Sequence, residues 1–151
     1  MNTKHFLMAI AAITLLASCT SKNEIDVNAL VGTWYTDLTG KTHFQWSDGP
    51  ALNVWEFKAD STGVCDVFFI ADDQPKAIEH QPFTFKVNGN IMTFVMEDST
   101  WDGIITLADD QLTIDSGGSA IIFDRASAEQ AARFEEWSHM ELTQVTPTPT
   151  E

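Results

Sequence analysis

The side chains of this chain that could carry out chemistry are its histidines, its two cysteines and its 22 acidic residues. His43, His80 and His139 stand far apart, and none has a second ligand at the spacing of a zinc site. The paired aspartates of ADDQ, at 71–74 and 108–111, could bind a hard cation, but aspartate also favours turns through local hydrogen bonds. A Gly-x-Ser-x-Gly nucleophile motif is absent from the sequence. We therefore expect no enzyme activity, no catalytic residue, no metal site and no cofactor.

The N-terminal segment has the features of a secretory signal. Lys4 and His5 precede an apolar run, residues 6–18, which is shorter than the roughly 20 residues that a membrane-spanning helix needs. The next motif, LASC at 16–19, resembles the lipobox of bacterial lipoproteins, in which the signal is cleaved before the cysteine and the cysteine is acylated. The resemblance implies a signal peptide over residues 1–18. It also implies a lipid on Cys19, the mature N-terminus, that attaches the protein to a membrane.

The second cysteine, Cys65, lies in an apolar run with the period of a strand. If Cys19 carries the lipid, Cys65 has no partner and no intramolecular disulfide forms. Its acidic neighbour Asp66 opposes formation of a thiolate. The sequence therefore predicts a buried, inert thiol at this position.

The chain is acidic, with 8 Lys and Arg against 22 Asp and Glu and a net charge of −14. Removal of the leader, which holds one lysine, makes the net charge −15. Because nucleic acid is bound through a basic surface, we expect no nucleic-acid partner. An anionic membrane surface would also be repelled, so the lipid must provide the attachment. A well-solvated surface accounts for the acidity without a cation-binding role.

Residues 30–142 have the pattern of one domain built from short strands. A polar tether, residues 19–29, precedes this domain, and a Thr- and Pro-rich tail, residues 143–151, follows it and is expected to be disordered. Alternating or apolar runs are separated by turn sequences such as DSTG, NGN, ADD and SGG. The expected strands are 31–37, 52–59, 64–71, 82–87, 91–97, 101–107, 111–115 and 120–125, with 42–46 as either a strand or a loop.

These strands, about eight in number, have tight turns and no helices between them, so neighbouring strands must be antiparallel. Full closure removes the exposed edges of a long antiparallel meander. We therefore predict an all-β, antiparallel up-and-down barrel. A two-sheet sandwich has the same periodicity and is the alternative.

A single helix is predicted within residues 127–142, at the end of the domain. Ser127 is a suitable N-cap, and Gln130 occupies the capping-box position three residues later. Ala131, Phe134 and Trp137 recur at helical spacing. This apolar stripe favours a helix packed on the outside of the barrel over a helix that binds a partner.

The strand LVGTWYTD at 30–37, the meander and the closing helix together resemble the lipocalin-like family, and the lipobox adds a resemblance to bacterial lipocalin-like lipoproteins. The similarity covers most of residues 30–140 and is specific at GTW and at FDRAS, residues 123–127. It implies a lipocalin-like barrel in which Trp34 plugs the closed end. It also implies that Gly32 lets the chain enter close beneath that tryptophan.

The same resemblance implies that Arg125, at the end of the last strand, closes the barrel by capping Trp34. Arg125 would then lie within roughly 6 Å of the Trp34 ring and donate hydrogen bonds to carbonyls before Val31. The alternative is an ordinary surface arginine that pairs with Asp124 or Glu129 and contributes little.

Two functions fit these features. The chain has 10 Phe and 5 Trp, and five of these aromatic residues on expected strands could line a cup for a small apolar ligand: Trp55, Phe57, Phe83, Phe85 and Phe94. An eight-stranded barrel holds one small ligand or is filled by its own side chains. The family resemblance favours a lipid-anchored ligand-binding protein. The alternative is a solid-core interaction module of an envelope protein complex, in which the same aromatics are simply the core.

The leader also predicts where the protein resides. Export as a lipoprotein places it in the cell envelope. Thr20 follows Cys19, whereas in some Gram-negative lineages an aspartate at that position retains lipoproteins in the inner membrane. By that resemblance we expect attachment to the outer membrane, and the sequence leaves open whether the barrel faces the periplasm or the cell surface.

Overall fold

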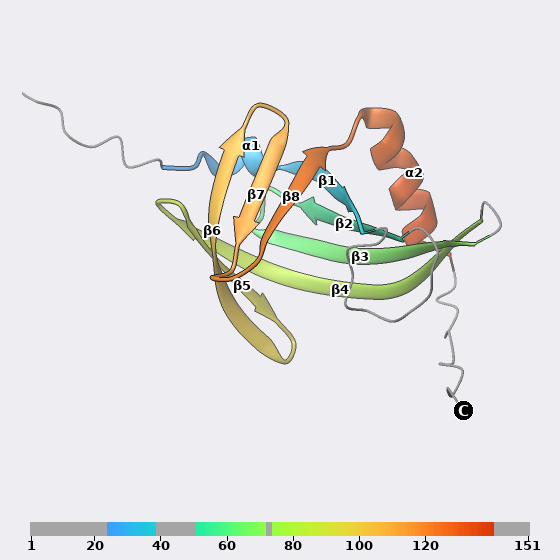
Figure 1. The fold of residues 1–151 in the computed structure, drawn as a ribbon, viewed down its shortest axis with the longest axis horizontal. Coiled ribbons are helices and arrows are strands. Elements are labelled where there is room, and N and C mark those ends of the chain that lie inside the picture. Colours follow the sequence, from blue (N-terminus) through green and yellow to red (C-terminus); the bar gives the residue numbers. More distant parts are fainter. Residues whose placement is uncertain (1–23, 39–50, 72–73, 141–151) are drawn as a thin grey trace, which may run out of the picture.

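The computed structural model describes residues 24–38, 51–71 and 74–140. Within these residues, eight antiparallel strands form one closed barrel in sequence order, from β1 to β8 and back to β1 (Figure 1). The predicted all-β up-and-down barrel with a C-terminal helix is thus confirmed, and the sandwich is excluded. The elements are α1 (Val27–Leu30), β1 (Gly32–Asp37), β2 (Ala51–Phe57), β3 (Thr62–Ala71), β4 (Gln74–Asn88), β5 (Ile91–Met96), β6 (Ser99–Ala108), β7 (Gln111–Asp115), β8 (Ala120–Arg125) and α2 (Ala128–Ser138).

The barrel closes through a short seam between its first and last strands. β1 pairs with β2 along its whole length, but with β8 only at Trp34–Arg125 and Tyr35–Asp124. Trp34 belongs to the GTW motif and Tyr35 follows it directly, while Asp124 and Arg125 belong to FDRAS. Closure therefore depends on a small number of contacts at this point.

The largest difference from the expected strands is in β4, which begins at Gln74 rather than near residue 82. Residues 74–84 of β4 are paired with β3, whereas only Thr84–Asn88 are paired with β5. The first part of β4 is therefore a sheet edge, where proline is tolerated because one side of the backbone needs no ladder partner. Pro75 and Pro82 lie in this edge. The segment 42–46 is outside the described residues.

The interior of the barrel is filled by inward-pointing side chains from all eight strands. Met92, Phe94 and Leu112 have no exposed surface. Gly63 on β3 makes room for the Phe83 ring, because a Cβ at residue 63 would overlap that ring. The core thus combines large aromatic groups with a glycine directly opposite one of them.

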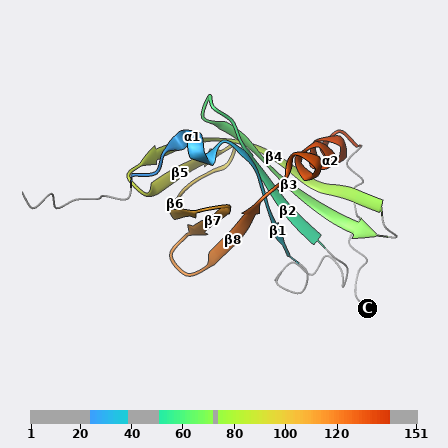
Figure 2. The ribbon, with the colours of Figure 1, turned by 90° about the horizontal axis from the view of Figure 1, so that it is seen from above.

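α2 begins as the sequence predicts and packs on the outside of the barrel. The Ser127 hydroxyl accepts a hydrogen bond from the Gln130 amide, and the Gln130 side chain accepts one from the Ser127 amide. Phe134 packs with Val54 and Phe68, whose side chains lie on the outer faces of β2 and β3. Figure 2 shows α2 outside the barrel, beside these strands. The helix ends at Ser138, before the predicted residue 142. In the described part of the chain, neither helix is long and apolar enough to cross a membrane.

Residues 24–29, which the sequence assigned to the tether, belong to the folded domain. Ile25 and Val27 pack against the core, and the Ile25 amide donates to the Gly89 carbonyl at 3.1 Å. Asp26 caps α1 by accepting a hydrogen bond from the Asn28 amide at 2.9 Å. The rest of the tether, the signal peptide and the tail at 143–151 lie outside the described residues.

Candidate functional site

The GTW motif begins β1, just after α1. Trp34 is fully buried, and its indole N–H donates to the Leu30 carbonyl at 2.8 Å. Gly32 has a φ of +133°, a conformation that residues with a Cβ rarely adopt, and a Cβ there would lie 3.1 Å from Nη1 of Arg125. Gly32 therefore lets the chain pass from α1 into β1 directly beside the guanidinium group.

Arg125, the last residue of β8, contacts this motif from the last strand. Its guanidinium carbon lies 4.1 Å from the centroid of the Trp34 ring, which confirms the contact predicted from the sequence. Nη1 donates to the Val31 carbonyl at 3.1 Å, and Nη2 donates to the Ala29 carbonyl at 2.7 Å. Nε lies 3.4 Å from the exposed carboxylate of Asp110. One side chain thus connects β8, the Trp34 ring and the segment that precedes β1.

The five aromatic residues that were expected to line a ligand pocket come together in the barrel interior. All five are at most 6% exposed. The Trp55 ring lies 5.2 Å from Phe83 and 5.3 Å from Phe94, and Phe57 lies 5.2 Å from Phe85, measured between ring centroids. These distances are typical of rings in direct contact. The five rings therefore pack against one another as one cluster.

Asn53 is a polar residue beside this cluster that the sequence analysis did not single out. Its side-chain carbonyl accepts hydrogen bonds from the Trp55 indole at 2.8 Å and from the Cys65 thiol at 3.4 Å. Its position in the sequence could have identified it, because residues 53, 55 and 57 alternate along one strand and therefore share the inward face. Cys65 is buried as predicted, and burial raises the pKa of its thiol to about 12.

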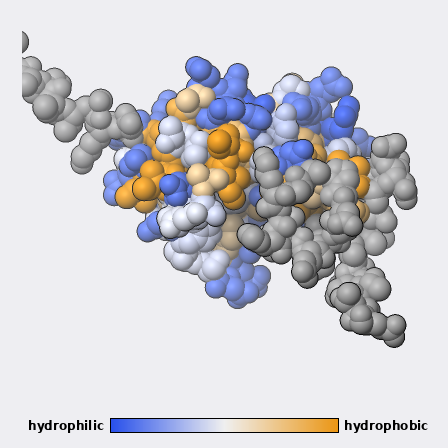
Figure 3. Space-filling model, viewed as in Figure 1, coloured by the Kyte–Doolittle hydropathy of each residue, from blue (hydrophilic) through white to orange (hydrophobic). Residues whose placement is uncertain are grey.

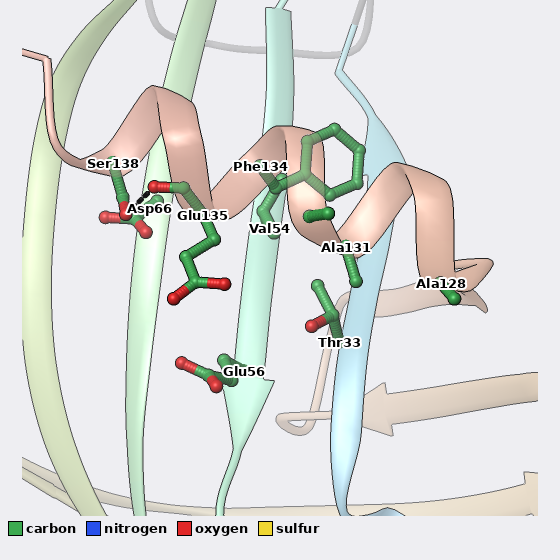
Figure 4. A pocket seen from close by; sticks show the side chains of 10 residues that line it. Thr33, Val54, Glu56, Asp66, Ala128, Ala131, Phe134, Glu135 and Ser138 are labelled. Atoms are coloured by element: carbon green, nitrogen blue, oxygen red, sulfur yellow. Dashed lines mark hydrogen bonds between the residues drawn. The ribbon is translucent and has the colours of Figure 1, made fainter.

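The structure also contains a cavity outside the barrel, between α2 and the outer faces of β1–β3 (Figure 4). Its volume is about 330 Å³, at the lower end of the range for small-molecule sites. Val54 and Phe134 supply apolar lining, while Glu56 from β2 and Glu135 from α2 extend into the space between sheet and helix. None of the five interior aromatics lines this cavity.

A buried acid lies at one side of the same cavity. Asp66 is 8% exposed, and its carboxylate lies 2.6 Å from Nδ1 of His80 on the neighbouring strand. Burial raises the pKa of the Asp66 carboxyl, and the hydrogen bond to His80 offsets part of that rise. Within the described ranges, no three His, Cys, Asp or Glu side chains converge as metal ligands.

The remaining candidate residues are placed as follows. Cys19, the predicted site of lipid attachment, and His43 lie outside the described residues. His139 is the C-cap of α2. No family model matches the chain, and no curated protein matches its sequence.

Proposed function

We propose that this protein is a lipid-anchored, lipocalin-like protein of the cell envelope whose barrel is a solid interaction module. The short apolar leader and the LASC motif support attachment through Cys19, and Thr20 supports residence in the outer membrane. The up-and-down barrel with Arg125 over Trp34 supports the lipocalin-like type. In this function the barrel is a rigid body that presents its outer faces to an envelope partner.

The observation that carries the proposal is the mutual packing of the five interior aromatics. Aromatic pairs at such distances each contribute about 0.5–1.5 kcal/mol beyond the burial of their surface. A ligand that entered between the rings would have to break several of these contacts. Met92 and Leu112, both without exposed surface, close the same interior from other strands.

Lipid attachment is tested by metabolic labelling with palmitate. We expect the full-length protein to incorporate label and to fractionate with outer membranes, whereas Cys19→Ser should do neither. Equal labelling of the two proteins, or recovery of the unmodified chain in the soluble periplasmic fraction, would contradict the anchor.

The solid core is tested with N-phenyl-1-naphthylamine, an apolar probe that becomes fluorescent in apolar pockets. We expect no saturable binding to the folded protein, and native mass spectrometry should find the chain with its anchor and no further small molecule. Saturable binding accompanied by quenching of tryptophan fluorescence would show that the interior opens to a ligand.

Binding of a small ligand remains the second candidate because of the cavity beneath α2. Its mixed lining suits a molecule with an apolar body and a polar group. Ala131→Phe would fill this cavity, whereas Ala120→Phe on β8 would leave it open. A small molecule that co-purifies with Ala120→Phe but not with Ala131→Phe would favour this function.

A further inference from the structure

We propose that the barrel docks on the membrane in one orientation, with Ile91 and Ile104 resting on a zwitterionic lipid surface. These two residues are named the tether-side surface. The inference rests on the proposed lipid at Cys19 and adds to it the face that meets the bilayer.

The first argument is the position at which the tether joins the barrel. Ile25 donates its amide hydrogen to the carbonyl of Gly89, in the turn between β4 and β5. Ile25 is the sixth residue after Cys19, and a fully extended chain of six residues spans at most about 22 Å. The lipid is therefore held within this distance of the β4–β5 turn, whatever path the tether takes.

The second argument is the apolar surface found beside this turn. Ile91 begins β5 immediately after the turn and is 44% exposed, and Ile104 is its direct partner on β6 and is 52% exposed. Their chain neighbours Met92 and Ile105 are buried inside the barrel, so the two isoleucines point outward. Figure 3 shows hydrophobic side chains gathered on the side of the molecule that holds β6–β8.

Charge identifies the kind of lipid surface. Asp115 lies opposite Ile104 on β7, and Asp102 precedes Ile104 by two residues on the same outward face. Carboxylates beside the isoleucines, on a chain of net charge −14, would be repelled by anionic headgroups. Zwitterionic headgroups carry no such penalty, so the tether-side surface fits them.

This orientation directs the rest of the molecule away from the membrane. β4 is 15 residues long, a contour length of about 45 Å at the usual rise per residue, and only its last residues reach the β4–β5 turn. In Figure 1, α2 lies at the opposite side of the molecule from α1 and the β4–β5 turn. The cavity beneath α2 would then face a partner rather than the lipid.

The test uses hydroxyl-radical footprinting of the mature chain, from Cys19 onward, on phosphatidylcholine vesicles. Coupling Cys19 to a maleimide lipid holds the protein there without biological acylation, and the buried Cys65 thiol stays unreactive. We expect oxidation of Ile91 and Ile104 to fall at least threefold relative to the uncoupled chain. Val95 and Ile122, which are 41% and 54% exposed, should be oxidised as before. Phosphatidylglycerol vesicles should give less protection.

A matched pair of variants separates docking from tethering. Ile104→Asp should abolish protection of Ile91 on the vesicles, whereas Ile122→Asp, at an equally exposed site, should leave that protection intact. Uniform protection of all four side chains, protection of none, or protection of Val95 alone would overturn the orientation. Protection without vesicles that rises with protein concentration would assign the surface to a second copy instead. Palmitate labelling tests the anchor separately.

Discussion

Arg125 offers the most direct test of how this barrel is held closed. Truncation to alanine removes the guanidinium that lies over Trp34 and donates to the carbonyls of Val31 and Ala29. The side chain is 30% exposed, so water screens part of each interaction. The backbone of residue 125 and its pairing with Trp34 in the seam are unchanged by the substitution.

The expected loss follows from these contacts. A hydrogen bond from a charged donor contributes about 1.5–3 kcal/mol when buried, and partial exposure lowers this to about 1 kcal/mol for each of the two bonds. The contact with the indole ring adds about 1 kcal/mol. The ion pair with Asp110, whose side chain is 85% exposed, adds little. Arg125→Ala should therefore lower the free energy of unfolding by about 3 kcal/mol and the melting temperature by about 10 °C.

Urea denaturation followed by tryptophan fluorescence measures this loss, and the only other arginine in the chain provides the control. Arg133 forms an exposed pair with Glu129 one helical turn away, so Arg133→Ala should lose less than about 0.5 kcal/mol. Arg125→Lys keeps the positive charge but lacks the planar guanidinium with its several donors. It should therefore recover less than half of the unfolding free energy that Arg125→Ala loses. If Arg125→Ala is no less stable than Arg133→Ala, then the cap does not hold the end of the barrel together.

Three further predictions concern single residues. Gly63→Ala should destabilise the fold by about 1–3 kcal/mol because its Cβ would overlap the Phe83 ring, whereas Gly118→Ala, where a Cβ meets nothing, should be nearly neutral in urea denaturation. The raised pKa of Asp66 means that the folded state binds its proton more tightly. Acidification through that pKa should therefore raise the free energy of unfolding of the wild type relative to that of Asp66→Asn. A difference in unfolding free energy that stays constant from pH 7 to pH 3 would refute this. Cys65 should react with a thiol reagent at pH 7 only after unfolding, because burial raises its pKa to about 12; rapid labelling of the native protein would contradict this.

Much of the strand order could be predicted from the sequence because several of the turns are short and chemically distinctive. Gly89, for example, has a φ of +66° in the hairpin predicted from Asn-Gly-Asn. The extension of β4 was missed because Pro75 and Pro82 are unfavourable in a paired strand, and nothing local indicates that this part of β4 is an edge. Local patterns therefore determine which residues form strands, but pairing partners decide where some strands end.

The contact between Arg125 and Trp34 was predictable for a different reason. The lipocalin-like resemblance implied this contact, and antiparallel pairing in a closed meander permits it by bringing the last strand beside the first. The two residues are direct partners in the seam. The bond to Ala29 matches the expectation that the spare donors of the guanidinium reach carbonyls before Val31, whereas the second bond goes to the carbonyl of Val31 itself. By contrast, the packing of Ile25 and Val27 onto the core was not predicted, because the polar residues around them made the segment look like a tether.

Whether the aromatic residues enclose a ligand or one another could not be decided from periodicity, because alternation identifies the inward face of a strand and says nothing about the space within. That space depends on how closely opposite strands approach. Here Gly63 lets the Phe83 ring lie directly against β3. The Asn53 side-chain carbonyl accepts a hydrogen bond from the Trp55 indole N–H and so holds that ring within the cluster. A glycine and an asparagine on inward positions are weak signals in a sequence, yet together they allow bulky rings to fill the barrel. Under the proposed function, a partner would therefore bind the outer surface, where α2 and its cavity lie.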